Sequence, residues 1–213
     1  MRYDMCLDMA EHKIPPDKHS GRTDEELAEL CRDGNEDAFK ELMRRYLRPI
    51  YNFVYQYGKT VENAEDISQD AFFKVWKNIH RFTKGRQFRP WLYTIARNTA
   101  LDHLKKKRAV SFTELDDPEE NLQFADTLED EGPLQAETLD TAIETARLTK
   151  SLEKLHPDHR AILMLHYREE MTFDEIAGIV GRPMNTVKSW HRRALLRLRE
   201  IMVAPETGSP ETT

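Results

Sequence analysis

Cysteine and glycine are scarce in this chain, and it has no long hydrophobic run. Cys6 and Cys31 are the only cysteines among 213 residues. They are too few for a disulfide framework or a metal knuckle, which is typical of a reducing compartment. Only 8 glycines are present, which favours helices over a turn-rich β fold. No apolar stretch approaches the roughly 18 residues of a membrane span, and the first residues lack the apolar region of a signal peptide. These absences predict a helical, cytoplasmic protein without membrane insertion.

Acidic and basic residues are segregated along the chain. The formal net charge is −6, but residues 109–146 hold twelve of the 38 acidic residues and no lysine or arginine. All 32 basic residues therefore face 26 acidic residues elsewhere, which gives a net charge of +6 outside that segment. A positive surface of this kind suits nucleic acid as a partner. The acidic composition, together with Pro118, Gly132 and Pro133, predicts a flexible linker over residues 109–146.

Apolar periodicity predicts two small helical domains, one on each side of this linker. A capping box from Thr23 to Glu26 starts the first helix of the first domain, and a second capping box begins at Thr172. Pro49 falls within the second predicted helix, which it should kink or divide. The predicted fold is all-α, with a four-helix domain and a C-terminal helical domain. The predicted boundaries are a tail over 1–21, the first domain over 22–108, the linker over 109–146, the second domain over 147–202 and a tail over 203–213.

The stretch from Phe82 to Arg108 has the composition of a nucleic-acid-binding surface. Aromatic residues alternate with eight lysines and arginines, and Asp102 is its only acidic residue. Cations neutralise phosphates, and flat rings stack on unstacked bases with about 1–3 kcal/mol per base, so the stretch suits DNA whose bases have left the duplex. The alternative is a helix whose rings belong to the core and whose basic end is solvated.

Residues 172–199 have the pattern of a helix-turn-helix. A short capped helix is followed by a turn at Gly181 and by a second helix with many hydrogen-bond donors. In this motif the start of the second helix enters the major groove, where Lys and Arg meet guanine edges and hydroxyls meet bases or phosphates. The alternative is a helical hairpin with a basic face in solvent. The predicted donors are Thr186, Lys188, Ser189, Arg192, Arg193, Arg197 and Arg199.

Two long motifs resemble the group IV, or extracytoplasmic-function (ECF), sigma factors of bacterial RNA polymerase. The first, over residues 37–108, contains DAFKELMRRY, AEDISQDAFFKVW and FRPWLYTIARNTALDHLKKKR. The second, over residues 152–200, contains LEKLHPDHRAILMLHY and TFDEIAGIVGRPMNTVKSWHRRALLRLRE. The motifs stand in the family's order and cover more than half of the chain. The resemblance implies a dissociable specificity subunit of the polymerase that is not an enzyme and binds no metal or other cofactor.

The resemblance also implies three sets of site residues. The set that docks on the clamp helices of the polymerase's largest subunit is Asp66, Gln69, Asp70 and Phe72. The set that melts the promoter and reads its minus-ten element is Trp91, Arg97, Asn98, Lys105, Lys106, Lys107 and Arg108. The set that reads the minus-thirty-five element is Thr186, Lys188, Ser189, Arg192 and Arg193. For the first set the alternative is a solvated helix face.

Three positions have more than one interpretation. Trp91 either shapes the DNA-binding helix or belongs purely to the core, and one ring of Trp91 and Tyr93 should be exposed because both cannot point inward. Family members usually have Gly where Asn185 stands and Arg where Trp190 stands. Asn185 is expected to cap a helix. Trp190 replaces a cation that would hold phosphate, which leaves recognition of the upstream element open.

Two other function classes compete with the sigma-factor interpretation. A stand-alone transcriptional regulator would bind duplex DNA without polymerase, usually as a dimer on a palindrome. An enzyme would gather the acidic residues of one helix into a metal site, but no His lies among them and no Gly-rich loop is near. Those acidic residues are Glu62, Glu65, Asp66 and Asp70. The resemblance favours the sigma factor, with core RNA polymerase, promoter DNA and an anti-sigma factor as its expected partners.

Overall fold

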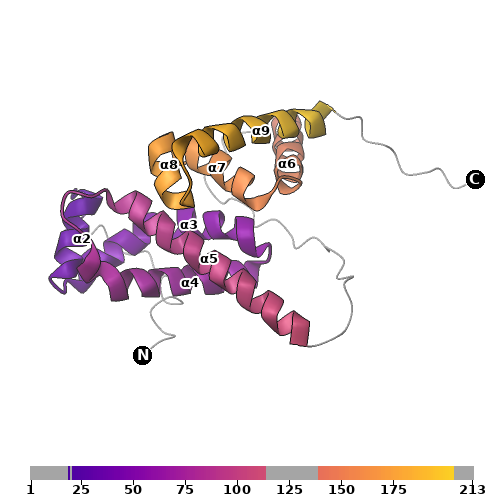
Figure 1. Ribbon diagram of the computed structural model, residues 1–213. Coiled ribbons are helices and arrows are strands. Elements are labelled where there is room, and N and C mark those ends of the chain that lie inside the picture. The colour runs from indigo at the N-terminus through magenta and orange to yellow at the C-terminus, as the bar shows by residue number, and fades with distance from the viewer. Residues whose placement is uncertain (1–18, 20, 114–138, 204–213) are drawn as a thin grey trace, which may run out of the picture. The chain divides into compact units, whose positions relative to one another are not determined.

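A computed structural model describes residue 19 and residues 21–113 and 139–203, with side chains described outside 107–113 and 139–145. These residues form helices and no strand, which confirms the predicted all-α fold (Figure 1). The chain divides into two compact units, Met1–Leu122 and Gln123–Thr213. Most of the two predicted tails, and the middle of the predicted linker, lie outside the described residues. None of the described helices is long and apolar enough to cross a membrane.

The first unit is built around its longest buried helix, α3, which contacts α2, α4 and α5. The side chains of Phe53, Ile67 and Leu92 belong to its core and are inaccessible to solvent. The capping box at the start of α2 is present as predicted, since the Thr23 hydroxyl accepts the Glu26 N–H and the Glu26 carboxylate accepts the Thr23 N–H. The elements are α2 (Asp24–Arg32), α3 (Glu36–Gly58), α4 (Val61–Asn78), η1 (Ile79–Arg81) and α5 (Phe88–Thr113).

Pro49 does not divide its helix, because α3 runs without interruption from Glu36 to Gly58. Proline in a helix interior costs about 3 kcal/mol, since it removes one backbone hydrogen bond and crowds the preceding turn. Tyr46 and Ile50, on either side of Pro49, are both buried against the rest of the unit. Burial of an apolar side chain contributes about 1.5–3 kcal/mol, so packing on both sides offsets the local cost.

The second unit packs three helices onto its last one, α9, which contacts α6, α7 and α8. Ile162, Leu165, Ile176 and Val187 form its core. Thr172 and Glu175 form the predicted capping box at the start of α8. The elements are α6 (Leu139–Glu153), α7 (Pro157–Tyr167), α8 (Phe173–Val180) and α9 (Met184–Val203).

Helices extend into both ends of the predicted linker. α5 continues to Thr113, beyond the predicted end at residue 108, and α6 begins at Leu139, before the predicted start at residue 147. Neither extension contains Pro or Gly, so nothing local stops the helix there. The acidic residues of the intervening segment 114–138 lie outside the described residues.

Cys31 is a core residue of α2. It is buried, and burial raises the pKa of its thiol to about 12. A thiol that stays protonated is neither a nucleophile nor a metal ligand, so Cys31 acts as a small apolar side chain.

Candidate nucleic-acid interface

The aromatic residues at the start of α5 belong mainly to the core. Phe82 and Phe88 are buried and their ring centroids lie 5.8 Å apart, while Trp91 lies 5.4 Å from Phe82 and is only partly buried. Tyr93 is 0% exposed and packs edge-on against Phe53 at 5.0 Å. The prediction that these rings offer stacking platforms is therefore wrong for Phe82, Phe88 and Tyr93. Trp91 is the more exposed ring of the Trp91–Tyr93 pair.

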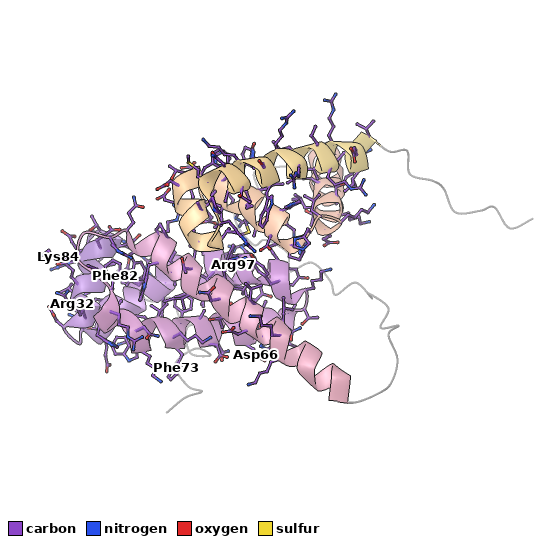
Figure 2. The ribbon with its side chains drawn as sticks, viewed as in Figure 1. Arg32, Asp66, Phe73, Phe82, Lys84 and Arg97 are labelled. Carbon is purple, nitrogen blue, oxygen red and sulfur yellow. The ribbon has the colours of Figure 1, made fainter. Side chains whose placement is uncertain are left out.

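Between Phe82 and Phe88 the chain forms an exposed basic loop, residues 83–87. Lys84 and Arg86 flank Gly85, whose φ of 82° lies in the left-handed region that glycine adopts readily. The Arg86 N–H donates to the Thr83 carbonyl at 3.1 Å, which closes a turn. In Figure 2, Lys84 lies with Phe82 and Arg32 toward one end of the first unit. The loop therefore presents two cations on a support of buried rings.

Lys84 and Arg86 are missing from the site residues predicted from the sequence. Their charge contributes to the basic composition of residues 82–108, but within this stretch the family resemblance implies roles only for residues farther along the chain. A glycine between two cations, enclosed by Phe82 and Phe88, is the local signal that marks such a loop.

Farther along α5, several predicted minus-ten residues lie at the surface. Asn98, Lys105 and Lys106 are exposed, and Arg97 is partly exposed. Asp102, the only acidic residue of this stretch, lies 3.6 Å from Lys74 of α4, so its charge is balanced by a neighbouring helix. This surface of α5 keeps its positive character. The side chains of Lys107 and Arg108 lie outside the described residues.

The acidic face of α4 differs from the prediction at one position. Asp66, Gln69 and Asp70 are exposed as expected. Phe72 is only 3% exposed, whereas Phe73 is 46% exposed. At 3.6 residues per turn, position 72 falls on the same side as the buried Val75, and position 73 falls on the side of Asp66 and Asp70. Figure 2 labels Asp66 and Phe73 on this helix. Phe72 therefore supports α4 from within, and the apolar side chain of the exposed face is Phe73.

The acidic residues of α4 do not assemble a metal site in the part of the chain that the structure describes. Glu62, Glu65, Asp66 and Asp70 are all exposed. No group of three or more His, Cys, Asp or Glu side chains within the described ranges is arranged to hold a metal ion.

In the second unit, α8 and α9 form a helix-turn-helix. Gly181 ends α8 with φ 67°, and its N–H donates to the Ala177 carbonyl at 2.9 Å. Val187 and Ala194 are buried on the inner side of α9. Its outer side carries the predicted donors: Lys188, Ser189, Arg192 and Arg193 are exposed, and Thr186 is partly exposed.

Asn185 does not cap this helix. α9 begins at Met184, and the Val187 N–H donates to the Pro183 carbonyl at 3.1 Å, so Asn185 lies inside the first turn. Its exposed side chain stands beside the predicted donors instead.

The inner side of α9 is joined to α7 and α8 by a cluster of rings. His166 stacks on Phe173 at 4.5 Å, and His191 lies 5.1 Å from both of these rings. The Nδ1 atom of His166 lies 3.0 Å from the Met171 carbonyl and must carry the hydrogen, because a carbonyl only accepts. Burial, and then the nearby His166, lower the pKa of His191. The lowered pKa favours the neutral form of His191 on the inner side of α9, while the exposed cations lie on the outer side.

Comparison with known proteins assigns both units. Residues 42–110 match the family model Sigma-70 region 2, and residues 145–198 match Sigma-70, region 4. These two matches define a protein of the sigma-70 class.

Individual relatives identify the subfamily within this class. The ECF RNA polymerase sigma factor RpoE of Cereibacter sphaeroides is 32% identical over 186 residues, which cover 86% of this chain and 97% of that protein. The ECF RNA polymerase sigma factor SigW of Bacillus subtilis is 30% identical over 168 residues, covering 78% of this chain and 90% of that protein. The chain belongs to the ECF RNA polymerase sigma factors.

A solved structure has a similar fold. The sigma factor RpoE of Bartonella quintana, crystallised with the anti-sigma factor NepR, superposes with a TM-score of 0.60 at 26% identity. The match covers 77% of this chain and 96% of that one.

Proposed function

We propose that this sigma factor divides promoter recognition between its two units. The first unit, predicted over residues 22–108, would bind core RNA polymerase and open the minus-ten element. The second unit, predicted over residues 147–202, would bind the minus-thirty-five element. The family matches over 42–110 and 145–198 support these boundaries. The observation that carries the proposal is the two-sided character of α9, which exposes cations on its outer side and packs rings on its inner side.

Polymerase binding is assigned to the exposed face of α4. Asp66, Gln69 and Asp70 supply acceptors, and Phe73 takes the place of Phe72 as the apolar contact. A half-exposed aromatic side chain within a polar rim is typical of an interface anchor, because its apolar surface is removed from water only when the partner binds. The partner is the clamp coiled coil of the polymerase.

Promoter opening is assigned to α5 and to the basic loop 83–87. Unstacking a base step costs a few kcal/mol, which contacts to the extruded strand must offset. Because Phe82, Phe88 and Tyr93 are buried, Trp91 is the one ring of the predicted four that keeps exposed surface, and the other contacts come from polar and charged groups. Asn98 has an amide that can meet a base edge, and the exposed lysines, together with Lys84 and Arg86 of the loop, hold the backbone. The chain makes and breaks no covalent bond in this mechanism.

We propose control by an anti-sigma factor and a cytoplasmic location. The Bartonella quintana relative was crystallised with an anti-sigma factor. An exposed acidic face on α4 and exposed cations on α9 are surfaces that such a partner would have to cover to block polymerase and DNA. The cytoplasm is the proposed location because RNA polymerase, the proposed partner, acts there.

Run-off transcription tests the proposal. Purified core polymerase is incubated with a pool of promoter fragments, with and without this protein. We expect specific transcripts that depend on the protein, and their upstream sequences identify the elements that it reads. Absence of transcripts, together with tight duplex binding by the protein alone as a dimer, would favour a stand-alone regulator instead.

A further inference from the structure

Arg182 lies in the turn between the two helices of the helix-turn-helix, directly before α9. Its backbone is restrained on both sides. Gly181 is in the left-handed region, and the N–H of Arg182 donates to the Ala177 carbonyl at 3.2 Å. Pro183 follows, with φ set by its ring. The side chain of Arg182 is exposed. The turn therefore presents a cation from a rigid base at the start of the helix that carries the predicted donors.

The guanidinium of Arg182 lies over the indole of Trp190. Its central carbon is 6.0 Å from the centroid of the ring, which is within the range of an attractive cation–π contact. Such a contact restricts the long side chain, yet the N–H groups at its edge stay available to an anion. Trp190 is one of the two positions at which the chain departs from the family's usual residues.

Trp190 is itself held by α7. It is partly buried, and its ring lies 5.9 Å from the ring of His159. Burial, and then the neighbouring His156, lower the pKa of His159. The lowered pKa favours the neutral imidazole beside the indole. Arg182 of the turn and His159 of α7 therefore both lie near the ring of Trp190.

The place of Arg182 and Trp190 relative to the other donors suggests what Arg182 binds. Trp190 follows Thr186 by four residues and precedes Arg193 by three, so on a helix the three side chains are neighbours. Thr186 and Arg193 belong to the predicted minus-thirty-five set. A duplex that meets these two side chains also brings its backbone to the edge of α9 where Arg182 lies, and the positive end of the helix dipole favours an anion there.

We propose that Arg182 contacts a backbone phosphate of the upstream promoter element and that Trp190 positions it. The inference rests on the proposed function of α9 as the reader of this element. The cation that the family resemblance implies at position 190 is supplied in this arrangement from position 182, and the indole supports it. Trp190 is a positioning residue in this arrangement and Arg182 is the contact.

The test measures duplex binding by the holoenzyme assembled from the full-length chain. The probe is a labelled duplex carrying the upstream element of a promoter found by run-off transcription, titrated over a series of salt concentrations. Loss of one phosphate contact reduces the slope of log K against log salt by about 0.9, which corresponds to about fivefold weaker binding at about 0.15 M salt. We expect this result for Arg182→Ala.

Two variants of Trp190 separate positioning from direct contact. Trp190→Leu removes the aromatic face, and we expect two- to fivefold weaker binding. Trp190→Phe keeps a ring, and we expect affinity close to that of the wild type. The double variant Arg182→Ala, Trp190→Leu should bind no more weakly than Arg182→Ala alone, because the ring acts only through the arginine.

The control variant is Lys154→Ala. It removes one exposed charge outside the helix-turn-helix and should leave the salt slope unchanged. An unchanged slope in Arg182→Ala overturns the phosphate contact. Additive losses in the double variant overturn the positioning role, and thermal unfolding of each variant identifies losses due to misfolding. If the wild-type holoenzyme yields no specific transcript, the proposed function itself has failed.

Discussion

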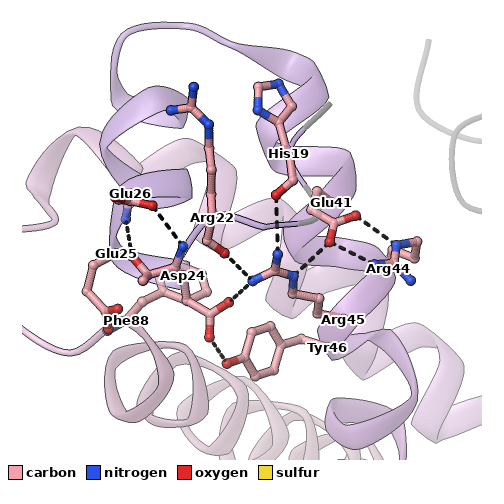
Figure 3. Close-up of polar contacts among 11 residues, drawn as sticks. His19, Arg22, Asp24, Glu25, Glu26, Glu41, Arg44, Arg45, Tyr46 and Phe88 are labelled. Atoms are coloured by element: carbon pink, nitrogen blue, oxygen red, sulfur yellow. Dashed lines mark hydrogen bonds and ion pairs between the residues drawn. The ribbon is translucent and has the colours of Figure 1, made fainter. Parts of the chain in front are cut away.

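Glu25 of α2 caps the first turn of α5 by accepting the backbone N–H of Phe88 at 3.0 Å, across 63 residues of chain (Figure 3). Helix α2 also contacts the preceding basic loop, because Glu29 pairs with Lys84 at 3.3 Å. The start of α5, which precedes the proposed DNA-binding surface of this helix, is thus fixed by another helix.

Removal of this cap should loosen the loop. Glu25→Ala leaves the Phe88 N–H without its acceptor, which costs about 1 kcal/mol of stability. We expect promoter opening, followed by permanganate reactivity of unpaired thymines, to slow more than polymerase binding weakens. Glu25→Gln retains an acceptor oxygen and should restore most of the rate. Glu36→Ala, an exposed acid in the first turn of α3, is the matched control. A slowed rate in Glu25→Gln equal to that in Glu25→Ala would contradict the capping role.

Acid should weaken the first unit through Glu41. Its side chain is 1% exposed and lies 2.7 Å from both Arg44 and Arg45 (Figure 3). The hydrogen bond from Arg44, and then that from Arg45, lower the pKa of Glu41 from 4.5 to about 2. A carboxyl group whose pKa is lower in the folded state stabilises the fold at pH values above its pKa in the unfolded state. This stability is lost as the pH falls toward its pKa in the folded state.

We therefore expect the free energy of unfolding to fall by about 3 kcal/mol between about pH 5 and pH 2 because of this group. Urea denaturation across that range measures the fall, and Glu41→Gln should flatten it. Asp37→Asn is the control, because Asp37 forms a surface pair with Lys40 that contributes little. A pH profile unchanged by Glu41→Gln would show that other groups dominate acid unfolding.

The two adjacent phenylalanines of α4 should behave differently. Phe73→Ala should weaken binding to core polymerase by about 1–2 kcal/mol, as expected for an interface anchor, with little effect on stability. Phe72→Ala opens a cavity in the core and should cost about 3–5 kcal/mol of unfolding free energy. Fluorescence titration with core polymerase and denaturant unfolding measure the two effects. Undiminished polymerase binding by Phe73→Ala would remove Phe73 from the interface.

The outer side of α9 should dominate the salt dependence of duplex binding. Lys188→Ala combined with Arg192→Ala removes two exposed cations. We expect weaker binding of the upstream element and a salt slope reduced by about two, measured by titration with holoenzyme. The Lys154→Ala variant again provides the control. A slope equal to that of the wild type would mean that neither side chain meets a phosphate.

Asn98 should affect opening and spare duplex binding. Its side chain is exposed on α5, so Asn98→Ala should fold normally. We expect the closed complex to form with unchanged affinity, while single-stranded minus-ten oligonucleotide binds more weakly, because the amide no longer meets a base edge. Transcription from linear DNA should fall, and transcription from a template with the minus-ten bases already unpaired should fall by a similar factor. Equal transcription by variant and wild type on linear DNA would contradict the assignment.

Local signals in the sequence predicted most of the elements correctly. Thr23 and Thr172 start helices because a hydroxyl and a carboxylate three residues later satisfy each other's backbone N–H groups. Gly181 ends α8 because it adopts a left-handed conformation without strain. The donors of α9 were predicted by their spacing, since Val187 and Ala194 mark the opposite, buried side. Each of these features depends on residues within one or two helical turns.

The sequence by itself thus determined most of the helices, the capping boxes at Thr23 and Thr172, the helix-turn-helix and the family of the protein. Tertiary structure decided that the rings of Phe82 and Phe88 are core. It also placed Arg182 over Trp190 and Glu25 at Phe88. The physical reason is that burial depends on which helix faces meet, and long-range hydrogen bonds depend on which ends come together. Residues of the same type therefore cannot be told apart by burial or by long-range hydrogen bonds until the helices pack.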